Sequence, residues 1–218
     1  MGKYKALLFN ARFFSALAVA VCLATAAAGA WVGSSAGPVQ PKEKLLERGN
    51  LIYAADPVKI TEIKSSGRAV KLNEKFAGGD DWLKGTALRL KNISTKEIVH
   101  IQLDFDFPET GDAGPVMAYQ MMLGRRPGTD NPLASPLSLA PGAETEVSID
   151  EHVYAAMTNL VERRRPLQSI NRVKVRIAFV AFADGTGYGA GGTFYRQDPN
   201  HPRRYLPVIN GQPAAPSN

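Results

Sequence analysis

The stretch from Ala87 to Phe107, ALRLKNISTKEIVHIQLDFDF, holds two alternating runs of residues on either side of a polar turn. In the second run apolar and polar side chains take turns: the apolar set is Val99, Ile101, Leu103, Phe105 and Phe107, and the polar set is His100, Gln102, Asp104 and Asp106. A period of two is typical of a strand with one buried face. The first run alternates in the same way around Leu88 and Leu90. The two runs therefore predict a β-hairpin at the centre of an all-β sandwich.

The segments around this stretch predict further short strands and one helix. The strands are expected at 59–63, 69–72, 116–123, 137–140, 144–149, 173–182 and 193–196. The strand from Val173 becomes apolar on both faces at its end, which favours a place in the middle of a sheet. Asp150 is a candidate N-cap for a helix over about 151–163, and Val153, Met157, Leu160 and Val161 would form its apolar face.

The first thirty residues have the composition of a secretory signal peptide. Basic residues precede an apolar run from Phe13 to Ala30, and Ala28-Gly29-Ala30 fits the small-residue cleavage pattern. The protein is therefore expected to be exported, to the periplasm, the cell envelope or the exterior. Two alternatives remain: the apolar run extends through Val32 and could act as an uncleaved membrane anchor, or lipoprotein processing could occur at Cys22.

Cys22 is the single cysteine of the chain, and cleavage of the leader would remove it. The mature chain would then have no thiol chemistry and no disulfide, so it must depend on its apolar core. Beyond the leader we expect a poorly ordered linker over 31–57, with a possible short helical turn at 42–48. We expect the sandwich domain over 58–197 and a proline-rich surface tail over 198–218.

The strand ending at Lys91-Asn92, the turn Ser94-Thr95-Lys96 and the alternating strand after it resemble exported bacterial immunoglobulin-like or fibronectin-III-like domains. The segment LSLAPG, residues 137–142, fits the same pattern. The resemblance covers roughly 58–197, implies an immunoglobulin-like antiparallel sandwich and implies no activity. Two features depart from the immunoglobulin pattern: there is no Cys…Trp…Cys framework, and a helix is inserted before the last long strand.

The charge and the motifs of the chain exclude several classes of function. The net charge is +6, and three of the basic residues lie in the leader, so the remainder is too weakly basic to indicate a nucleic-acid partner. His100, His152 and His201 lack metal-ligand spacing and are interpreted as surface residues, so no metal or other cofactor is expected. Asp104 and Asp106 are interpreted as a solvated strand face neutralised by a nearby Lys or Arg.

The glycine-rich segment from Asp184 to Gly192 is interpreted as a flexible hairpin loop, since it has too few oxygen ligands for calcium. Aromatic and arginine side chains gather there and in the segment after it. The candidate partner-binding residues are Tyr188, Tyr195, Arg196, Arg203, Arg204 and Tyr205. Tyrosine and arginine are frequent anchors of protein interfaces. We expect Tyr188 to insert into a partner and the arginines to pair with acidic groups; the alternative is that these residues only pack or solubilise.

The sequence therefore favours an exported, non-enzymatic module that binds another protein or an envelope component. One alternative is a sandwich that binds carbohydrate or another small ligand, which an exposed aromatic groove would favour. A second is an enzyme of unrecognised chemistry, which a pocket with clustered histidine and carboxylate side chains would favour. Contact with a membrane is expected only if the leader is retained.

Overall fold

The computed structural model describes residues 41–49, 55–128, 135–189, 191–209 and 212–213, and the predicted leader lies outside them. The chain from Pro38 to its end forms one compact unit. Its strands are β1 (Lys42–Arg48), β2 (Val58–Ser65), β3 (Arg68–Ala69), β4 (Lys75–Gly78), β5 (Ala87–Asn92), β6 (Ile98–Phe107), β7 (Met117–Leu123), β8 (Glu144–Ser148), β9 (Arg172–Phe182), β10 (Thr186–Gly189), β11 (Thr193–Gln197), β12 (Tyr205–Ile209) and β13 (Gln212–Pro213). The helices are the 3-10 turns η1 (Pro108–Ala113) and η2 (Leu167–Ser169) and the α-helix α1 (Glu151–Val161).

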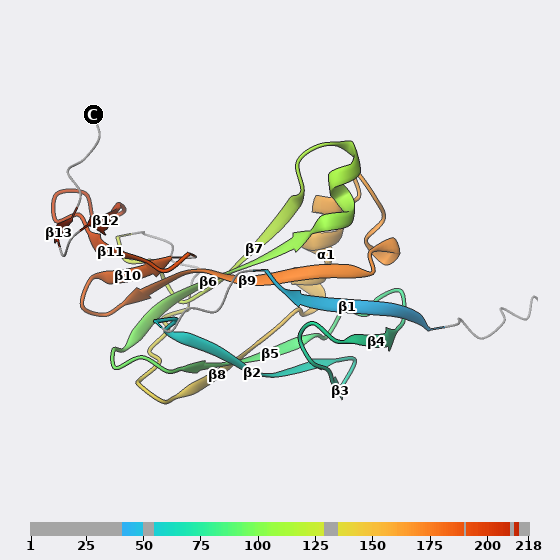
Figure 1. Cartoon of the computed structure of the whole chain (residues 1–218), viewed down its shortest axis with the longest axis horizontal. Coiled ribbons are helices and arrows are strands. Elements are labelled where there is room, and N and C mark those ends of the chain that lie inside the picture. Colours follow the sequence, from blue (N-terminus) through green and yellow to red (C-terminus); the bar gives the residue numbers. More distant parts are fainter. Residues whose placement is uncertain (1–40, 50–54, 129–134, 190, 210–211, 214–218) are drawn as a thin grey trace, which may run out of the picture. The chain divides into compact units, whose positions relative to one another are not determined.

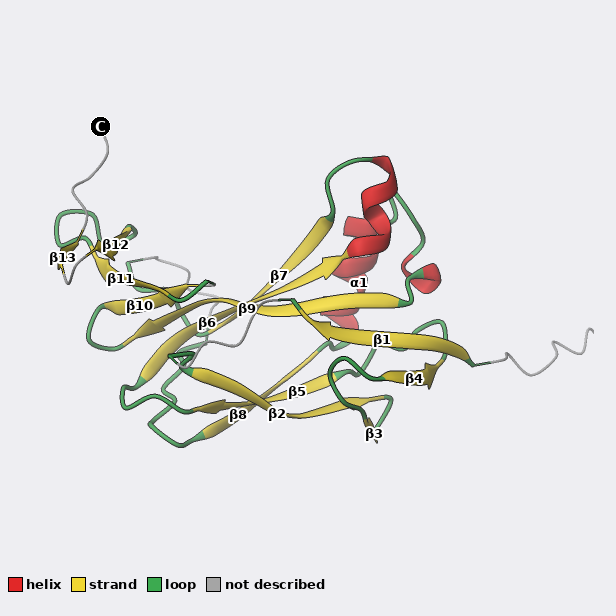
Figure 2. Cartoon of the chain, in the orientation of Figure 1, coloured by secondary structure: helices red, strands yellow, loops and turns green. Residues whose placement is uncertain are grey.

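The strands form two sheets that face each other as layers (Figure 2). The smaller sheet has the order β3-β2-β5-β8, and all its pairings are antiparallel. The larger sheet is built around β9. β6 lies along one edge of β9, while β1 and β10 lie end to end along its other edge (Figure 1). The prediction of a mostly β protein with one helix is confirmed.

The predicted hairpin of 87–107 is wrong, because its two strands belong to different sheets. β5 pairs with β2 and β8, whereas β6 pairs with β7 and β9. Alternation shows which face of a strand is buried, but it does not show which strand lies beside it. Here both strands turn their apolar faces toward the same core from opposite sides, and residues 93–97 carry the chain across.

Asn92 holds this crossing together from a fully buried position. Its Nδ2 donates to the carbonyl oxygens of Lys96 and Leu139, both at 2.8 Å, and its Oδ1 accepts from the backbone and hydroxyl of Ser94. Ile98 and Leu139 then exchange two backbone hydrogen bonds as an isolated bridge. The amide group of Asn92 and the carbonyl of Lys96 are thus paired inside the fold and need no neighbouring strand.

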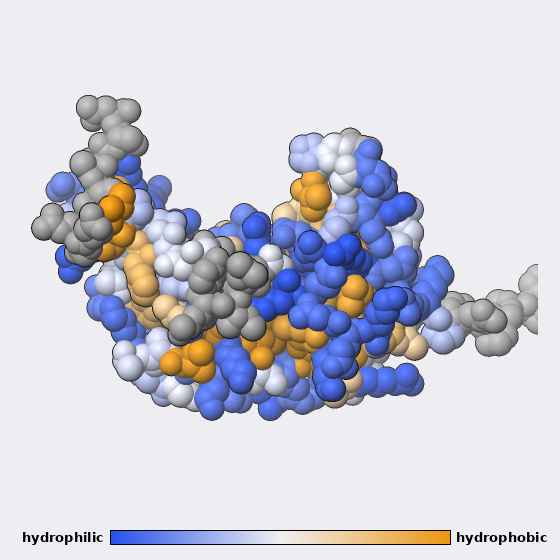
Figure 3. Space-filling view, viewed as in Figure 1, coloured by the Kyte–Doolittle hydropathy of each residue, from blue (hydrophilic) through white to orange (hydrophobic). Residues whose placement is uncertain are grey.

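The core lies between the two sheets. Leu88 and Leu90 face it from β5, and Ile101, Leu103 and Phe105 face it from β6, all less than 2% exposed. Figure 3 shows hydrophobic residues along the boundary between the layers, with hydrophilic residues on both sides. The predicted facing of β6 holds for these residues. At its start a bulge between Ile98 and His100 changes the register, so Val99 is only half-buried.

The interpretation of 31–57 as a linker is wrong for residues 42–48, which form β1. This strand pairs in parallel with β9 and antiparallel with β4. Lys44 and Leu46 point inward and are fully buried. A lysine at an inward position hides the alternation, which explains why the sequence suggested a helical turn.

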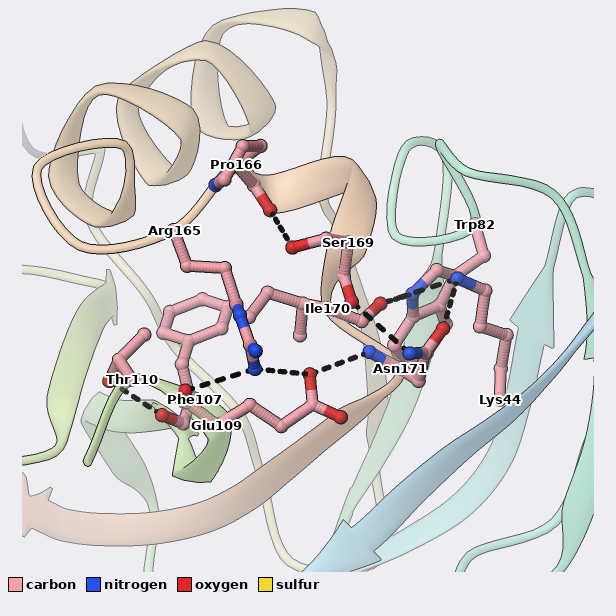
Figure 4. A network of polar contacts seen from close by, with 10 residues as sticks. All are labelled: Lys44, Trp82, Phe107, Glu109, Thr110, Arg165, Pro166, Ser169, Ile170 and Asn171. Atoms are coloured by element: carbon pink, nitrogen blue, oxygen red, sulfur yellow. Dashed lines mark hydrogen bonds and ion pairs between the residues drawn. The ribbon is translucent and has the colours of Figure 1, made fainter. Parts of the chain in front are cut away.

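Buried polar groups hold β1 against the loop before β9 (Figure 4). The Nζ of Lys44 donates to the Oδ1 of Asn171 at 2.9 Å and to the carbonyl of Ile170 at 3.3 Å. The Trp82 indole donates to that same carbonyl at 2.9 Å, and Glu109 accepts from the Asn171 backbone at 3.0 Å. Burial lowers the pKa of Lys44, with smaller opposing effects from Asp80 and Glu109. Trp82 is buried.

Helix α1 begins as predicted and ends earlier than predicted. The carboxylate of Asp150 accepts from the Val153 backbone at 2.8 Å, which caps the first turn. The α-helix ends at Val161, and Met157 and Val161 are its fully buried residues. In the part of the chain that the structure describes, no helix is long and apolar enough to span a bilayer.

The tail predicted over 198–218 is ordered where the structure describes it. Residues 198–204 form a closed turn, and β12 then pairs with β11 along the large sheet. Five prolines after residue 198 suggested a surface tail. However, Pro207 lies in β12, a strand near the edge of the sheet where the missing backbone N–H of proline is tolerated. The short strand β13 pairs antiparallel with the other side of β12.

Candidate functional site

Tyr188 does not project toward a partner. It lies in β10, is 4% exposed, and its hydroxyl donates to the Oδ1 of Asp56 at 2.7 Å. Arg48 forms an ion pair with the other oxygen of the same carboxylate at 3.0 Å. The expectation that Tyr188 inserts into a partner is therefore corrected: its ring closes the core beneath the β10–β11 hairpin.

The segment from Asp184 to Gly192 is only partly a loop, because its residues Thr186–Gly189 form β10 and pair with both β9 and β11. Both carboxylate oxygens of Asp184 have protein partners. Its carboxylate accepts from the backbone and hydroxyl of Thr186 and forms an ion pair with Lys96 at 2.7 Å. Burial alone would raise the pKa of Asp184, but these hydrogen bonds from Lys96 and Thr186 lower it to about 2.

The β11–β12 register divides the remaining candidates between two faces. Tyr195 pairs with Pro207 and Gln197 pairs with Tyr205, so both tyrosines lie on one face of the hairpin. Arg196 is the next residue after Tyr195 in β11, so its side chain points to the opposite face. The structure thus brings Tyr195 and Tyr205 together and leaves Arg196 apart from them.

The two tyrosines pack around Phe179 of β9. Tyr195 and Tyr205 meet its ring edge to face, with centroids 5.8 and 5.0 Å away. Two glycines of β10 make room for this cluster. A Cβ on Gly187 would lie 2.7 Å from the Phe179 ring, and one on Gly189 would lie 2.8 Å from the Tyr195 ring.

Arg126 covers this aromatic cluster from the segment after β7. Its guanidinium carbon lies 5.3 Å from the Phe179 ring centroid and 5.9 Å from that of Tyr205. Burial raises the pKa of Tyr205, and the nearby charge of Arg126 opposes that shift. Sequence reasoning missed Arg126, because it lies in a long polar loop almost eighty residues from Tyr205 and no motif connects the two.

Residues 198–204 form the wall opposite Arg126. The backbone of Asp198 donates to the Arg204 carbonyl at 2.9 Å, and its carboxylate accepts from the Asn200 backbone at 2.9 Å. The Nε of Arg203 donates to the carbonyl of Gly128 at 3.0 Å, which joins this turn to the segment after β7. Hydrogen bonds across both ends therefore fix the turn in place.

Between these segments lies an open depression of about 600 Å³, which we call the arginine depression. It is lined by Arg126, Gly128, Asn200, His201, Pro202, Arg203, Arg204 and Tyr205. Three of these residues are arginines and none is acidic. Arg204 is exposed, and its side chain forms no hydrogen bond or ion pair with the described residues. The depression is thus a concave positive surface suited to an anionic group.

His100 lies beneath this site and is fully buried, so its interpretation as a surface residue is wrong. Its Nδ1 lies 3.2 Å from the carbonyl oxygen of Gly124, where the chain turns from β7 toward Arg126. Burial lowers the pKa of His100, the hydrogen bond to the Gly124 carbonyl partly opposes this shift, and the positive charge of Arg126 adds to it. His152 and His201 are exposed, as predicted.

Asp104 and Asp106 are neutralised by an arginine, as the sequence predicted, but the interpretation as a solvated face is wrong for Asp104, which is buried at 4% exposed, while Asp106 is half-buried. Arg176 of β9 forms ion pairs with their carboxylates at 2.9 and 3.6 Å. In the described part of the chain, no three His, Cys, Asp or Glu residues lie close enough together to hold a metal ion.

Comparisons with protein-family models, with curated proteins and with solved structures find no match to this chain.

Proposed function

We propose that this chain is an exported, non-enzymatic binding module, and that the arginine depression recognises acidic side chains of a partner protein. The observation that carries the proposal is the lining of the depression, in which the described residues include three arginines and a histidine and no carboxylate. Arginine is favoured at protein interfaces because its planar guanidinium can donate two parallel hydrogen bonds to a carboxylate.

The architecture supports this role. The depression is formed by connecting segments at one end of the large sheet, and binding residues are often carried on loops that a rigid scaffold positions. We also propose that the two facing sheets are of the immunoglobulin-like kind. The passage of consecutive strands from one sheet to the other, as at 93–97, supports this proposal.

The geometry favours protein over carbohydrate as the ligand. Carbohydrate-binding sites present flat, exposed aromatic faces. Here Tyr195 and Tyr205 each pack edge to face against Phe179, and Arg126 lies over the rings of Phe179 and Tyr205. The described surface of the depression is therefore formed by cationic groups and backbone, with Tyr205 as the single aromatic residue among those described.

The proposal can be tested with poly-glutamate as a probe of acidic polypeptide. Arg204→Glu reverses a charge in the depression, and Arg68→Glu makes the same change at an exposed residue of the small sheet. We expect Arg204→Glu to weaken binding of the probe by about tenfold or more, and Arg68→Glu by less than about twofold. Binding of the parent should also fall with added salt.

Isothermal titration of the full chain with the probe gives both affinities, and circular dichroism confirms that both variants are folded. An equal loss in the two variants would show that the probe responds only to net charge. Either that result or unchanged binding in Arg204→Glu contradicts the assignment of the depression.

A further inference from the structure

Strand β7 is an edge strand of the large sheet. Among the described strands it pairs with β6 alone. The backbone of Met117 donates to the hydroxyl of Thr110, which in turn donates to the carbonyl of Phe107, the β6 residue opposite it. Met117 therefore directs its backbone toward β6. In an antiparallel ladder alternate residues direct their backbone groups to opposite edges, so the groups of Ala118, Gln120 and Met122 point away from β6.

The pairing of β6 with β9 leads to the same assignment of inward and outward backbone groups in β7. The carbonyl of Val175 accepts from the backbone of Gly49, so Val175 directs its backbone toward β1. Its neighbours Lys174 and Arg176 must then bond to Asp106 and Asp104 of β6. Leu103 and Phe105, on either side of Asp104, then direct their backbone groups toward β7, where they pair with Met121 and Tyr119. The backbone groups of Gln120 therefore point outward again.

The sequence of β7, MAYQMML, carries none of the usual protection of an edge strand. It contains no proline and no charged residue, although such residues normally prevent an exposed edge from pairing with other chains. Met122 of this strand is 56% exposed, whereas Met121 packs in the core.

A groove of about 490 Å³ runs along this edge. On the β7 side it is lined by three consecutive residues, Ala118, Tyr119 and Gln120. Consecutive strand residues point to opposite faces, so a groove that contacts all three lies beside the strand and not above it. On the other side it is lined by Ala156, Asn159, Leu160 and Arg163, which are spaced i, i+3, i+4 and i+7 and thus share one face of α1 and its last turn.

An edge strand beside a helix forms a site for strand addition: an extended peptide pairs with the strand, and its side chains contact the helix. Figure 1 shows α1 beside β7 at the border of the large sheet. An added strand would direct alternate side chains toward Ala156 and Leu160, and these side chains should be apolar. The intervening ones would face solvent.

The groove has a positive end. Arg163 is exposed and forms no ion pair with the described residues, and none of the described residues lining the groove is acidic. The guanidinium of Arg164 packs against Gly114, just before β7, so this end of α1 lies where β7 begins. The last residues of a strand added antiparallel to β7 would reach this end, and a carboxylate there would pair with Arg163.

We propose that the groove between β7 and α1 binds an extended segment of another protein, added antiparallel to β7, with alternating apolar residues and a carboxylate near its C-terminal end. A second copy of this chain is disfavoured by charge. Two β7 strands paired around a two-fold axis would bring the exposed Arg125 of one copy toward Arg163 of the other. This site is separate from the arginine depression and does not depend on the function proposed for it.

Selection from a phage-displayed library of random linear peptides on the immobilised full chain tests the proposal. We expect the enriched peptides to alternate apolar and polar residues and to carry Asp or Glu near their C-terminal end. For synthetic peptides of the enriched sequences, Arg163→Glu should weaken binding by about tenfold or more, and Arg196→Glu by less than about twofold.

Hydrogen exchange locates the bound peptide. The amides of Ala118, Gln120 and Met122 should slow on binding, whereas those of Tyr119 and Met121, already bonded to β6, should change little. Gln120→Pro removes one outward donor and should also weaken binding. The proposal is overturned if no peptide is enriched, if the peptides bind Arg163→Glu as well as the parent, or if sedimentation shows that β7 mediates self-association.

Discussion

At the scale of single residues, His100 shows how a polar side chain can be buried for a structural purpose. Its ring lies under the turn that leads from β7 to Arg126, with Nδ1 3.2 Å from the Gly124 carbonyl. Its Nε2 is buried and has no hydrogen-bond partner in the described part of the chain. Burial and the charge of Arg126 both disfavour the protonated ring, which lowers its pKa. The fold therefore favours the neutral form of His100 relative to the unfolded chain.

This burial makes the stability of the protein depend on pH. Because the pKa of His100 is lower in the folded state, the unfolded state binds a proton first as the pH falls below about 6.5. The full contribution of His100 is present above that pH and declines as the pH falls toward the folded-state pKa. His100→Asn retains a hydrogen-bond donor for the Gly124 carbonyl but has no ionisable ring. The variant should therefore lose less stability than the parent between about pH 7.5 and about pH 5.0, which lie about one unit or more above and below the unfolded-state pKa of histidine.

Guanidinium unfolding curves at the two pH values measure this effect, and His152→Asn, at an exposed position of α1, is the control. The control should follow the parent. If His100→Asn loses as much stability as the parent on acidification, His100 is not the group responsible.

At the scale of secondary-structure elements, β1 is the clearest test of the described fold, because the sequence suggested a linker there. Leu46 is fully buried in the core from β1, the strand that lies between β4 and β9 in the large sheet. Leu46→Ala should therefore lower the free energy of unfolding by about 2–5 kcal/mol, the usual cost of truncating a core leucine. Glu43→Ala, in the same strand, removes an exposed ion pair with Lys75 and should cost at most about 1 kcal/mol.

Urea denaturation of both variants gives the comparison. A linker would tolerate the two substitutions equally, so similar small losses at Leu46 and Glu43 would contradict the placement of β1 in the sheet.

The sequence predicted best those elements in which buried and exposed residues alternate regularly or a capping residue marks the start. Alternation located β5, β6 and β9, and Asp150 marked the start of α1. The pairing of strands could not be predicted in this way, because the polar turn at 93–97 is compatible with a hairpin and with a crossing between sheets. The buried Asn92, which bonds to Lys96 and Leu139, decides between them, and its second partner lies almost fifty residues away.

The candidate site was predicted in part for the same reason. Arg203, Arg204 and Tyr205 are consecutive, so composition alone brought them together. Arg126 joins them only through the fold. Tyr188 was misplaced because a tyrosine among glycines suggests a loop tip, whereas its pairing with Val180 and Phe194 places it within the sheet.

At the scale of the whole described unit, both proposed binding surfaces belong to the large sheet. The arginine depression lies against Phe179 and β12, and the peptide groove follows β7. The small sheet buries Leu88 and Leu90 against β6 and lines neither surface. This division depends on the chain crossing from one sheet to the other between Asn92 and Ile98, so the crossing is the central structural claim.

Disulfide trapping tests the crossing most directly. Cysteines at Lys91 and Glu144, placed in a Cys22→Ser background, would face each other across β5 and β8. Directly opposed residues of neighbouring strands have Cα atoms about 4.4–6.8 Å apart, which is the range that a disulfide requires. Cysteines at Lys91 and Val99 would face each other only in a hairpin. We predict that mild oxidation of the folded protein links the 91–144 pair and leaves the 91–99 pair as thiols, as measured by mass spectrometry of unreduced digests. A disulfide between 91 and 99, with none between 91 and 144, would contradict the two-sheet arrangement.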